Sequence, residues 1–136
     1  MQGRQRHIHI LGICGTFMGS LAILARQKGF KVTGSDKSVY PPMSTYLESQ
    51  GIEIIDGFGV EQLQDTIEVV IVGNCMTRGM PIIEHILNEN IAYTSGPAWL
   101  YENVLTEKHV IAVSGTHGKT TTTSMITKIL QDEGLD

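Results

Sequence analysis

Short apolar runs alternate with amphipathic stretches of helix length along the chain. The apolar runs predict β-strands at residues 7–13, 30–34, 53–55, 68–73, 91–94 and 109–114. The stretches between them repeat their apolar residues at helical spacing and predict α-helices at residues 17–28, 43–50, 81–90, 97–105 and 119–131. The run at 68–73 is continuously apolar, as expected of a parallel strand that is buried on both faces.

This alternation of strand and helix defines the expected fold class. It predicts an α/β protein with a Rossmann-like parallel sheet, helices on both faces and right-handed crossover connections. Ligands of such sheets bind beyond the carboxyl ends of the strands. The loops that follow residues 13, 34, 73, 94 and 114 are therefore the candidate binding loops.

Composition narrows the possible functions. The chain has 136 residues, of which 41% are apolar and 18% charged, which suits a globular domain with its own core. Its formal net charge of −4 gives no reason to expect nucleic acid or an anionic membrane as a partner. The apolar run after Arg6 is short and contains His9, which is unlike a signal peptide. We expect a cytoplasmic protein without a membrane span.

The two cysteines are candidates for a disulfide or a redox pair, and two of the histidines are candidates for a metal site. Cys14 and Cys75 lack the CxxC spacing, so free thiols in a reducing compartment are favoured. A single disulfide or a redox pair is the alternative. His7 and His9 share one face of the first predicted strand and could begin a metal site, although no further ligand is evident nearby.

The loop after the first strand has the sequence Gly-Ile-Cys-Gly-Thr-Phe-Met-Gly, from Gly12 to Gly19. Glycines allow the backbone to approach an anion, and the following helix offers free N–H donors. The strict GxGxxG pattern fails, because Cys14 and Phe17 stand where glycines are required. Asp36, after the second strand, could accept hydrogen bonds from a ribose or a base. We expect a nucleotide-diphosphate site here; a tight turn without a ligand is the alternative.

The loop after the last predicted strand reads SGTHGKTT, from Ser114 to Thr121. The general P-loop pattern requires glycine at position 113, where this chain has Val113, so this loop is tighter. Its other parts are present: Lys119 could neutralise the β- and γ-phosphates of ATP, and the Thr120 hydroxyl could bind Mg²⁺. The predicted ATP-binding residues are Gly115, Thr116, His117, Gly118, Lys119, Thr120 and Thr121, although His117 alone is more typical of a solvated loop.

Several of these stretches together resemble one family. They are GTHGKT at 115–120, the loop at 12–19, SDKSVYPPMST at 35–45, GNCMTRG at 73–79 and SGPAWL at 95–100. The chain resembles the Mur ligases, ATP-dependent enzymes of peptidoglycan metabolism that form amide bonds. The histidine in GTHGKT is similar to the branch that uses UDP-N-acetylmuramic acid. Members of that branch add L-alanine or a recycled tripeptide, and the other stretches are similar to those that add the tripeptide.

The resemblance implies a reaction and a division into domains. ATP would phosphorylate the muramic acid carboxylate, and the amine of L-alanyl-γ-D-glutamyl-meso-diaminopimelate would attack the acyl phosphate. Residues 1–107 would form the UDP-sugar-binding domain and residues 108–136 the start of a truncated central ATPase domain, namely its first strand, P-loop and helix. The rest of that domain and the C-terminal domain are absent. The isolated chain is then expected to bind the UDP-sugar without ligating, with residues from about 109 onward poorly anchored.

The resemblance also implies roles for individual residues. Lys119 and Thr120 would be catalytic, with Thr120 as the Mg²⁺ ligand. Asn74 could instead be a turn-former and Arg78 a solvated loop residue. The implied UDP-sugar-binding residues are Gly12, Cys14, Gly15, Thr16, Phe17, Met18, Asp36, Asn74, Thr77, Arg78 and Ser95.

Three rival interpretations belong to other classes of protein. An NAD(P)-dependent dehydrogenase would explain the first loop and Asp36, but not the broken GxGxxG pattern or the second phosphate loop. A small P-loop kinase would normally carry its P-loop after the first strand rather than the last. A free-standing nucleotide-sugar sensor fits the length of the chain without any catalysis.

Overall fold

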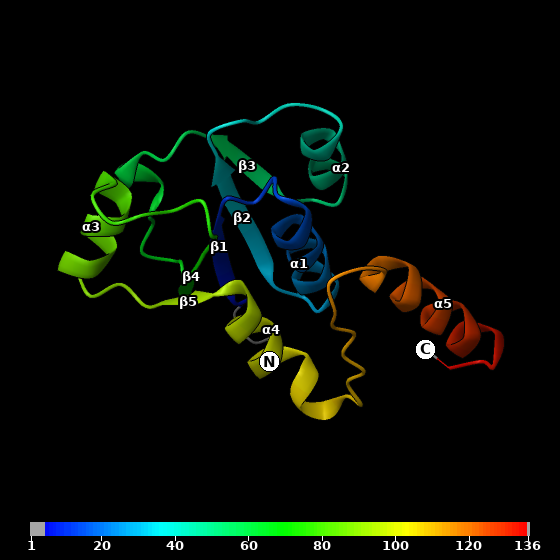
Figure 1. The fold of residues 1–136 in the computed structure, drawn as a ribbon. Coiled ribbons are helices and arrows are strands. Elements are labelled where there is room, and N and C mark those ends of the chain that lie inside the picture. Colours follow the sequence, from blue (N-terminus) through cyan, green and yellow to red (C-terminus); the bar gives the residue numbers. More distant parts are fainter. Residues whose placement is uncertain (1–4, 136) are drawn as a thin grey trace. The chain divides into compact units, whose positions relative to one another are not determined.

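A parallel five-stranded sheet forms the core of the larger, N-terminal part of the chain (Figure 1). The computed structural model describes residues 5–135. The strand order is β3-β2-β1-β4-β5, and every neighbouring pair is parallel. The strands are β1 (His7–Leu11), β2 (Lys31–Asp36), β3 (Glu53–Asp56), β4 (Val69–Val72) and β5 (Tyr93–Ser95).

Helices connect the strands and cover both faces of the sheet. They are α1 (Thr16–Gln27), α2 (Met43–Ser49), α3 (Pro81–Asn88) and α4 (Gly96–Asn103), together with the short 3-10 turn η1 (Val60–Gln62). A second 3-10 turn, η2 (Leu105–Glu107), and helix α5 (Lys119–Asp132) follow along the chain. One buried cluster joins the sheet to α1, α2 and α4, and a second joins it to α3 and to residues on either side of η1. The predicted α/β sheet with helices on both faces is confirmed.

Strand β1 is central, and all five of its residues are buried. Its side chains alternate between the two faces, as in any strand. Ile8 and Ile10 pack in the first cluster, whereas Leu11 packs in the second. The chain proceeds from β1 to β2 and β3 on one side, and from β4 to β5 on the other. The sheet therefore has its topological switch point between β1 and β4, where ligands of such folds bind.

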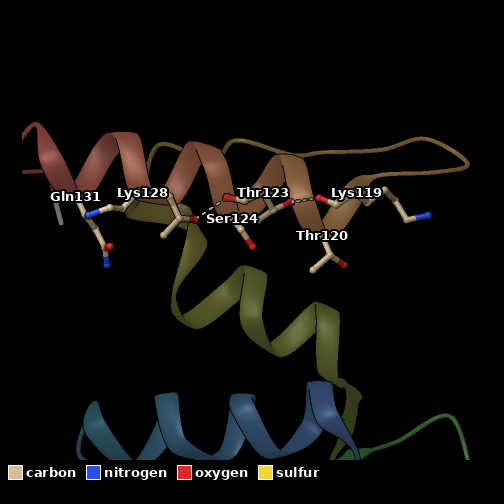
Figure 2. A pocket seen from close by; sticks show the side chains of 7 residues that line it. Lys119, Thr120, Thr123, Ser124, Lys128 and Gln131 are labelled. Atoms are coloured by element: carbon tan, nitrogen blue, oxygen red, sulfur yellow. Dashed lines mark hydrogen bonds between the residues drawn. The ribbon is translucent and has the colours of Figure 1, made fainter.

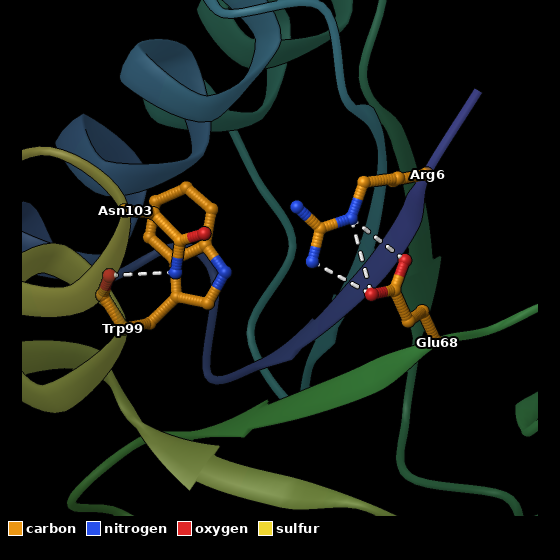
Figure 3. Close-up of polar contacts among 4 residues, drawn as sticks. All are labelled: Arg6, Glu68, Trp99 and Asn103. Carbon is orange, nitrogen blue, oxygen red and sulfur yellow. Dashed lines mark hydrogen bonds and ion pairs between the residues drawn. The ribbon is translucent and has the colours of Figure 1, made fainter. Parts of the chain in front are cut away.

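Aromatic and charged side chains pack at the amino ends of the strands (Figure 3). The Arg6 guanidinium pairs with the Glu68 carboxylate at 2.7 Å and lies 5.1 Å from the centre of the Phe30 ring. Phe30 meets Trp99 edge to face, with ring centroids 5.3 Å apart. Asn103 donates a hydrogen bond of 3.0 Å to the Trp99 carbonyl within α4. These contacts connect α4 to the end of the sheet that lies opposite the candidate binding loops.

The prediction of a strand at 109–114 is wrong. These residues form neither helix nor strand, and Val110 and Ile111 are 53% and 51% exposed. A strand must pair its backbone N–H and C=O groups with a neighbouring strand, and the described part of the chain supplies no neighbour for this one. The helix predicted at 119–131 is present as α5, but none of its residues, all of them described, is buried.

The chain divides into two compact units after Thr106. The first unit contains the sheet, and the second contains η2's last residue, the SGTHGKTT loop and α5. The assignment of residues 1–107 and 108–136 to two domains of a longer protein stays a prediction. Within residues 5–135, no helix is both long and apolar enough to cross a membrane.

Gly34 on β2 tests how tightly the first cluster is packed. A Cβ atom at Gly34 would lie 2.8 Å from the Ile10 carbonyl oxygen and would also overlap the Ile13 side chain. Gly34→Ala should therefore lower the free energy of unfolding by about 1–3 kcal/mol, the usual cost of overpacking. Gly59→Ala is the control, because its Cβ would meet only the mobile end of Glu61. Equal urea midpoints for the two variants would contradict this account of the packing.

The second unit should be the less stable one. An isolated helix as short as α5 is marginal in water without a surface to pack against. We expect the amides of α5 to exchange with solvent on the order of a thousandfold faster than those of β1, because buried strands open only with global unfolding. Hydrogen exchange followed by mass spectrometry measures both. Equal protection of the two elements would show that α5 has a packing partner in solution.

Candidate active site

The glycine loop, defined here as residues 12–15, connects β1 to α1 at the switch point. Gly12 has φ +86°, which favours glycine, and the N–H groups of Gly12 and Ile13 donate to the Ser35 carbonyl at 2.8 and 3.1 Å. Gly15 precedes α1 and provides no side-chain cap for the helix. The first N–H groups of α1 have no carbonyl four residues earlier in the helix, so they are available to an anion.

Asp36 fastens this loop to the end of β2. Its Oδ2 accepts a hydrogen bond of 3.0 Å from the Cys14 N–H, and its Oδ1 accepts one of 2.8 Å from the Lys37 N–H. A carboxylate has about four acceptor positions, so each oxygen can still accept a hydrogen bond from a ligand. Asp36 thus lies where the sequence placed it, and it also has a structural role that the sequence analysis did not foresee.

Both cysteines are free thiols in this structure. Burial, and secondarily the charge of Asp36, raise the pKa of the Cys14 thiol. A thiol with a raised pKa stays protonated near neutral pH and is a weak nucleophile. The structure therefore favours free thiols over the alternative of a redox pair.

The loop after β4 touches the glycine loop directly. A Cβ atom at Gly12 would lie 2.8 Å from the Cys75 sulfur, and one at Gly73 would lie 2.7 Å from the Leu11 carbonyl oxygen. The two loops can approach this closely only because both positions are glycine. The structure thereby brings Asn74 and Thr77, which follow on the same loop, to the edge where the glycine loop lies.

The start of α4 forms the third part of this edge. A Cβ atom at Gly96 would lie 2.8 Å from Phe17 and 2.9 Å from the Met18 sulfur, so α4 begins against the first turn of α1. The Ser95 hydroxyl accepts a hydrogen bond of 3.2 Å from the Ala98 N–H and caps α4. The described contact of Ser95 is therefore that of a helix cap.

A groove of about 500 Å³ lies beside these loops, between the carboxyl ends of β4 and β5 and helix α3. Three of the predicted residues, Asn74, Arg78 and Ser95, line it. Met76 and Tyr93 also line it, and Tyr93 is 56% exposed. Met76 lies within the loop from Asn74 to Arg78 that the resemblance assigned to the ribose or diphosphate, whereas Tyr93 was not predicted from the sequence. One feature of the sequence could have indicated Tyr93: it is an aromatic residue with a polar end near the carboxyl end of a predicted strand, where ligands of such sheets bind.

Arg78 is held by Glu84 on α3. Its Nε and Nη2 donate to the two carboxylate oxygens at 2.7 and 3.2 Å, and the Gly79 N–H donates to Glu84 Oε1 at 2.8 Å. This pairing raises the pKa of Arg78 and lowers the pKa of Glu84, so both stay charged. The Arg78 side chain is 75% exposed, and such surface pairs contribute little to stability. A phosphate could therefore replace Glu84 as the partner of Arg78.

The SGTHGKTT loop curls back on its own lysine. Lys119 Nζ donates to the Gly115 carbonyl at 2.8 Å, and Gly115 and Gly118 have φ values of +146° and +78°. Figure 2 shows Lys119 and Thr120 at the start of α5, on a flank whose concavity of about 420 Å³ is lined by residues of α5 alone. The Thr123 and Thr127 hydroxyls on this flank each donate to a helix carbonyl at 2.8 Å. One helix flank provides only one wall of a nucleotide site.

The residues of the SGTHGKTT loop fit the phosphates of ATP better than they fit the Mg²⁺ ion that accompanies it. Lys119 and the glycines that surround it suit an anion. Thr120 would supply one oxygen ligand to Mg²⁺, and residues 5–135 contain no cluster of three or more His, Cys, Asp or Glu side chains. Mg²⁺ usually keeps several waters and binds substrate phosphates together with one or two carboxylates.

The structure contradicts the possibility that His7 and His9 begin a metal site. Each of the four ring nitrogens of His7 and His9 has a protein partner at 2.7 to 3.1 Å. Their lone pairs and protons are engaged in a buried hydrogen-bond network, so neither ring has a nitrogen free to bind a metal ion.

A parallel sheet with helices on both faces and a glycine loop at its switch point defines a Rossmann-like domain. Comparison with known proteins identifies the family. The family model described as "Mur ligase family, catalytic domain" matches residues 7–107. The chain belongs to the Mur ligase family. The SGTHGKTT loop lies outside the matched range.

Individual relatives distinguish the members of this family. The chain is 61% identical over 130 residues to the UDP-N-acetylmuramate–L-alanyl-gamma-D-glutamyl-meso-2,6-diaminoheptandioate ligase of Haemophilus influenzae, covering 96% of this chain and 29% of the relative. It is 59% identical to the crystal structure of a murein peptide ligase from Psychrobacter arcticus, with a TM-score of 0.92 over 95% of this chain and 27% of that one. A UDP-N-acetylmuramate–L-alanine ligase from Lactobacillus gasseri is 35% identical over 131 residues, covering 96% of this chain and 30% of the relative. The chain thus spans less than a third of the length of each of these proteins.

Gly12 tests the contact between the two loops. Gly12→Ala should cost more stability than Gly79→Ala, although both positions have positive φ, of +86° and +92°. Both variants pay the left-handed backbone penalty of about 1–2 kcal/mol, but only the Gly12 Cβ also meets Cys75. Adding Cys75→Ala to Gly12→Ala should recover the difference. Urea unfolding of the variants measures it, and equal losses at Gly12 and Gly79 would contradict a close contact between the loops.

Proposed function

We propose that this chain is the N-terminal, UDP-sugar-binding part of an ATP-dependent ligase. The ligase would join UDP-N-acetylmuramic acid to L-alanyl-γ-D-glutamyl-meso-diaminopimelate in peptidoglycan recycling. The main support is the 61% identity to a relative that carries this activity in its name, against 35% to an L-alanine ligase. Because the relatives are bacterial proteins, a bacterial cytoplasmic location is part of the same proposal.

The glycine loop is proposed to bind the diphosphate of the UDP-sugar. Its support is physical: unpaired N–H groups at the start of α1, and the close approach to the backbone that Gly15 permits. Gly12 contributes by letting the loop pack against Cys75. Asp36, which has acceptor positions to spare, would accept hydrogen bonds from the uridine. Arg78 would leave Glu84 to pair with a phosphate, and Asn74, Thr77 and Ser95 would complete the pocket. In this proposal Cys14, Thr16, Phe17 and Met18 contribute through the loop and the first turn of α1.

Lys119 and Thr120 are proposed to serve ATP and Mg²⁺. The γ-phosphoryl group would pass to the muramic acid carboxylate, releasing ADP and forming an acyl phosphate. The tripeptide amine would then attack the acyl carbon, form the amide and release inorganic phosphate. This activation is needed because a carboxylate is a poor electrophile, and the protein contributes positioning and charge neutralisation. The site would be completed by parts of the longer protein, so this chain alone should not ligate.

Two other functions remain in competition with this one. A ligase that adds L-alanine would share the UDP-sugar site and differ in the acceptor amine. A non-catalytic nucleotide-sugar-binding module would share the site but not the ATP chemistry. The sheet and its loops favour none of the three, because all three would use the same UDP-sugar site.

Calorimetry with UDP-N-acetylmuramic acid tests the proposal directly. The chain should bind this ligand and should not bind NADH. Arg78→Gln should weaken binding about 10- to 100-fold, the effect of losing a charge-assisted hydrogen bond. Arg26→Gln is the matched control, since it removes the same charge from the exposed last turn of α1 and should leave the affinity unchanged. Binding of NADH alone would sink the proposal, and tripeptide-dependent ADP release by this chain would contradict the claim that it cannot ligate.

A further inference from the structure

Two buried histidines lie on the face of β1 that η1 covers, and the proposed function uses neither of them. His7 and His9 are 4% and 0% exposed. The Thr33 hydroxyl stands between their rings, 2.8 Å from His7 Nε2 and 2.7 Å from His9 Nδ1. The outer nitrogens reach the segment between β3 and β4: His9 Nε2 is 2.8 Å from Gln62 Oε1, and His7 Nδ1 is 3.1 Å from Thr66 Oγ1.

One backbone carbonyl fixes the direction of the hydrogen bonds around His9. The Gly57 carbonyl can only accept, so the Gln62 side chain must present its NH₂ group there, at 3.1 Å. Gln62 therefore turns its oxygen toward His9, and His9 must carry a proton on Nε2. In a neutral imidazole the other nitrogen is then an acceptor, so His9 Nδ1 accepts from the Thr33 hydroxyl.

The same direction continues to His7. The Thr33 hydroxyl donates its only proton to His9 Nδ1, so its oxygen accepts a hydrogen bond from His7 Nε2–H. His7 Nδ1 then accepts from the Thr66 hydroxyl. All five hydrogen bonds, from Thr66 to Gly57, are satisfied together in this direction when both rings are neutral and carry their proton on Nε2. Only at His9 is the neutral form required, because His9 Nδ1 must accept from Thr33.

A proton would have different consequences on the two rings. A proton on His7 Nδ1 would face Thr66, an exposed residue whose hydroxyl can turn to solvent and accept. A proton on His9 Nδ1 would face Thr33, which already accepts from His7. The Thr33 hydroxyl proton would then lose its acceptor in a buried position, which is costly.

We propose that His9, in its neutral Nε2–H form, is the centre of a proton-sensitive clamp that holds residues 57–66 against the sheet. The clamp joins Thr33 on β2 to Gln62 in η1, and Gln62 in turn holds the Gly57 carbonyl. The Gly57 N–H donates to the Asp36 carbonyl at 2.8 Å, so the clamped segment begins beside the residue that fastens the glycine loop.

The surroundings of both rings favour their neutral forms. Burial, the largest cause for both residues, lowers the pKa of His7 and of His9. The charged groups that face His7 are Lys31 on β2, which lowers its pKa further, and Glu53 on β3, which raises it; His9 also lowers the pKa of His7. Glu53 and the hydrogen bond to Gln62 oppose the lowering at His9.

The sign of the pH effect follows from these directions. Above about pH 6.5, the ordinary pKa of histidine, the rings are neutral whether the segment is closed or open. Below it, the opened segment takes up protons that the closed one resists. For an imidazole that gains its proton only when the segment opens, opening should become up to about tenfold more frequent per pH unit.

Nitrogen-15 NMR of the imidazoles and hydrogen exchange of the amides test the clamp in this chain. At pH 7.5, both rings should show the Nε2–H neutral tautomer. Between pH 6.5 and 5, exchange at residues 58–67, corrected for intrinsic rates, should accelerate at least tenfold relative to α1. An Nδ1–H tautomer or an imidazolium for His9 at pH 7.5, or exchange at 58–67 that does not depend on pH, would overturn the proposal.

Two variants separate the clamp from general destabilisation. Gln62→Glu gives His9 a carboxylate partner and should shift the onset of fast exchange at 58–67 to a different pH, because it favours the charged ring. Gln64→Glu adds the same charge at an exposed position two residues away and should leave the onset unchanged. Identical profiles for the two variants would show that His9 does not control the segment. These readouts do not involve nucleotide binding, so they succeed or fail independently of the proposed function.

Discussion

The close approach of the loops after β1 and β4 is the constraint on which the candidate site depends. The sheet diverges at these two strands, and the Gly12 backbone fills the space beside Cys75 with no room for a side chain. Asp36 holds the other side of the same loop through the Cys14 N–H. With both sides fixed, the first turn of α1 presents its N–H groups in one direction, and it does so without a side-chain cap that would compete with an anion.

This arrangement also explains why a broken GxGxxG pattern can still serve a phosphate. The second and third glycines of that pattern permit close approach to a ligand and close packing of helix on strand. In this chain Gly15 stands before α1, and Gly96 gives Phe17 and Met18 the space to pack against α4. The required absence of side chains is therefore met partly by glycines from other segments. Sequence patterns that count spacing within one loop do not detect that substitution.

The extent to which the sequence predicted the structure follows the same logic. The five strands of the sheet and the helices between them were predictable, because a buried parallel strand and an amphipathic helix leave local patterns. Residues 109–114 have the same local pattern, and the prediction of a strand there was still wrong. A strand needs a neighbouring strand to pair with, and a local pattern does not show whether one is present. Asp36 was predicted as a binding residue from its place at the end of the second strand, but its bond to Cys14 depends on tertiary structure. The network of His7 and His9 was missed because Thr33, Gln62 and Thr66 come from other segments of the chain.

The two phosphate-type loops differ in how far this chain completes them. The glycine loop has walls from β1, β4 and α4 within one compact unit, so its geometry is set by packing that is already present. The SGTHGKTT loop has Lys119 turned onto its own Gly115 carbonyl, and the helix behind it buries no residue. To bind a phosphate, Lys119 would have to give up its hydrogen bond to the Gly115 carbonyl, and α5 has no packed face that would hold the loop in place. Phosphate binding at this second loop would therefore require additional surfaces to order it, whereas the proposed site at the first loop is already held by its own neighbours.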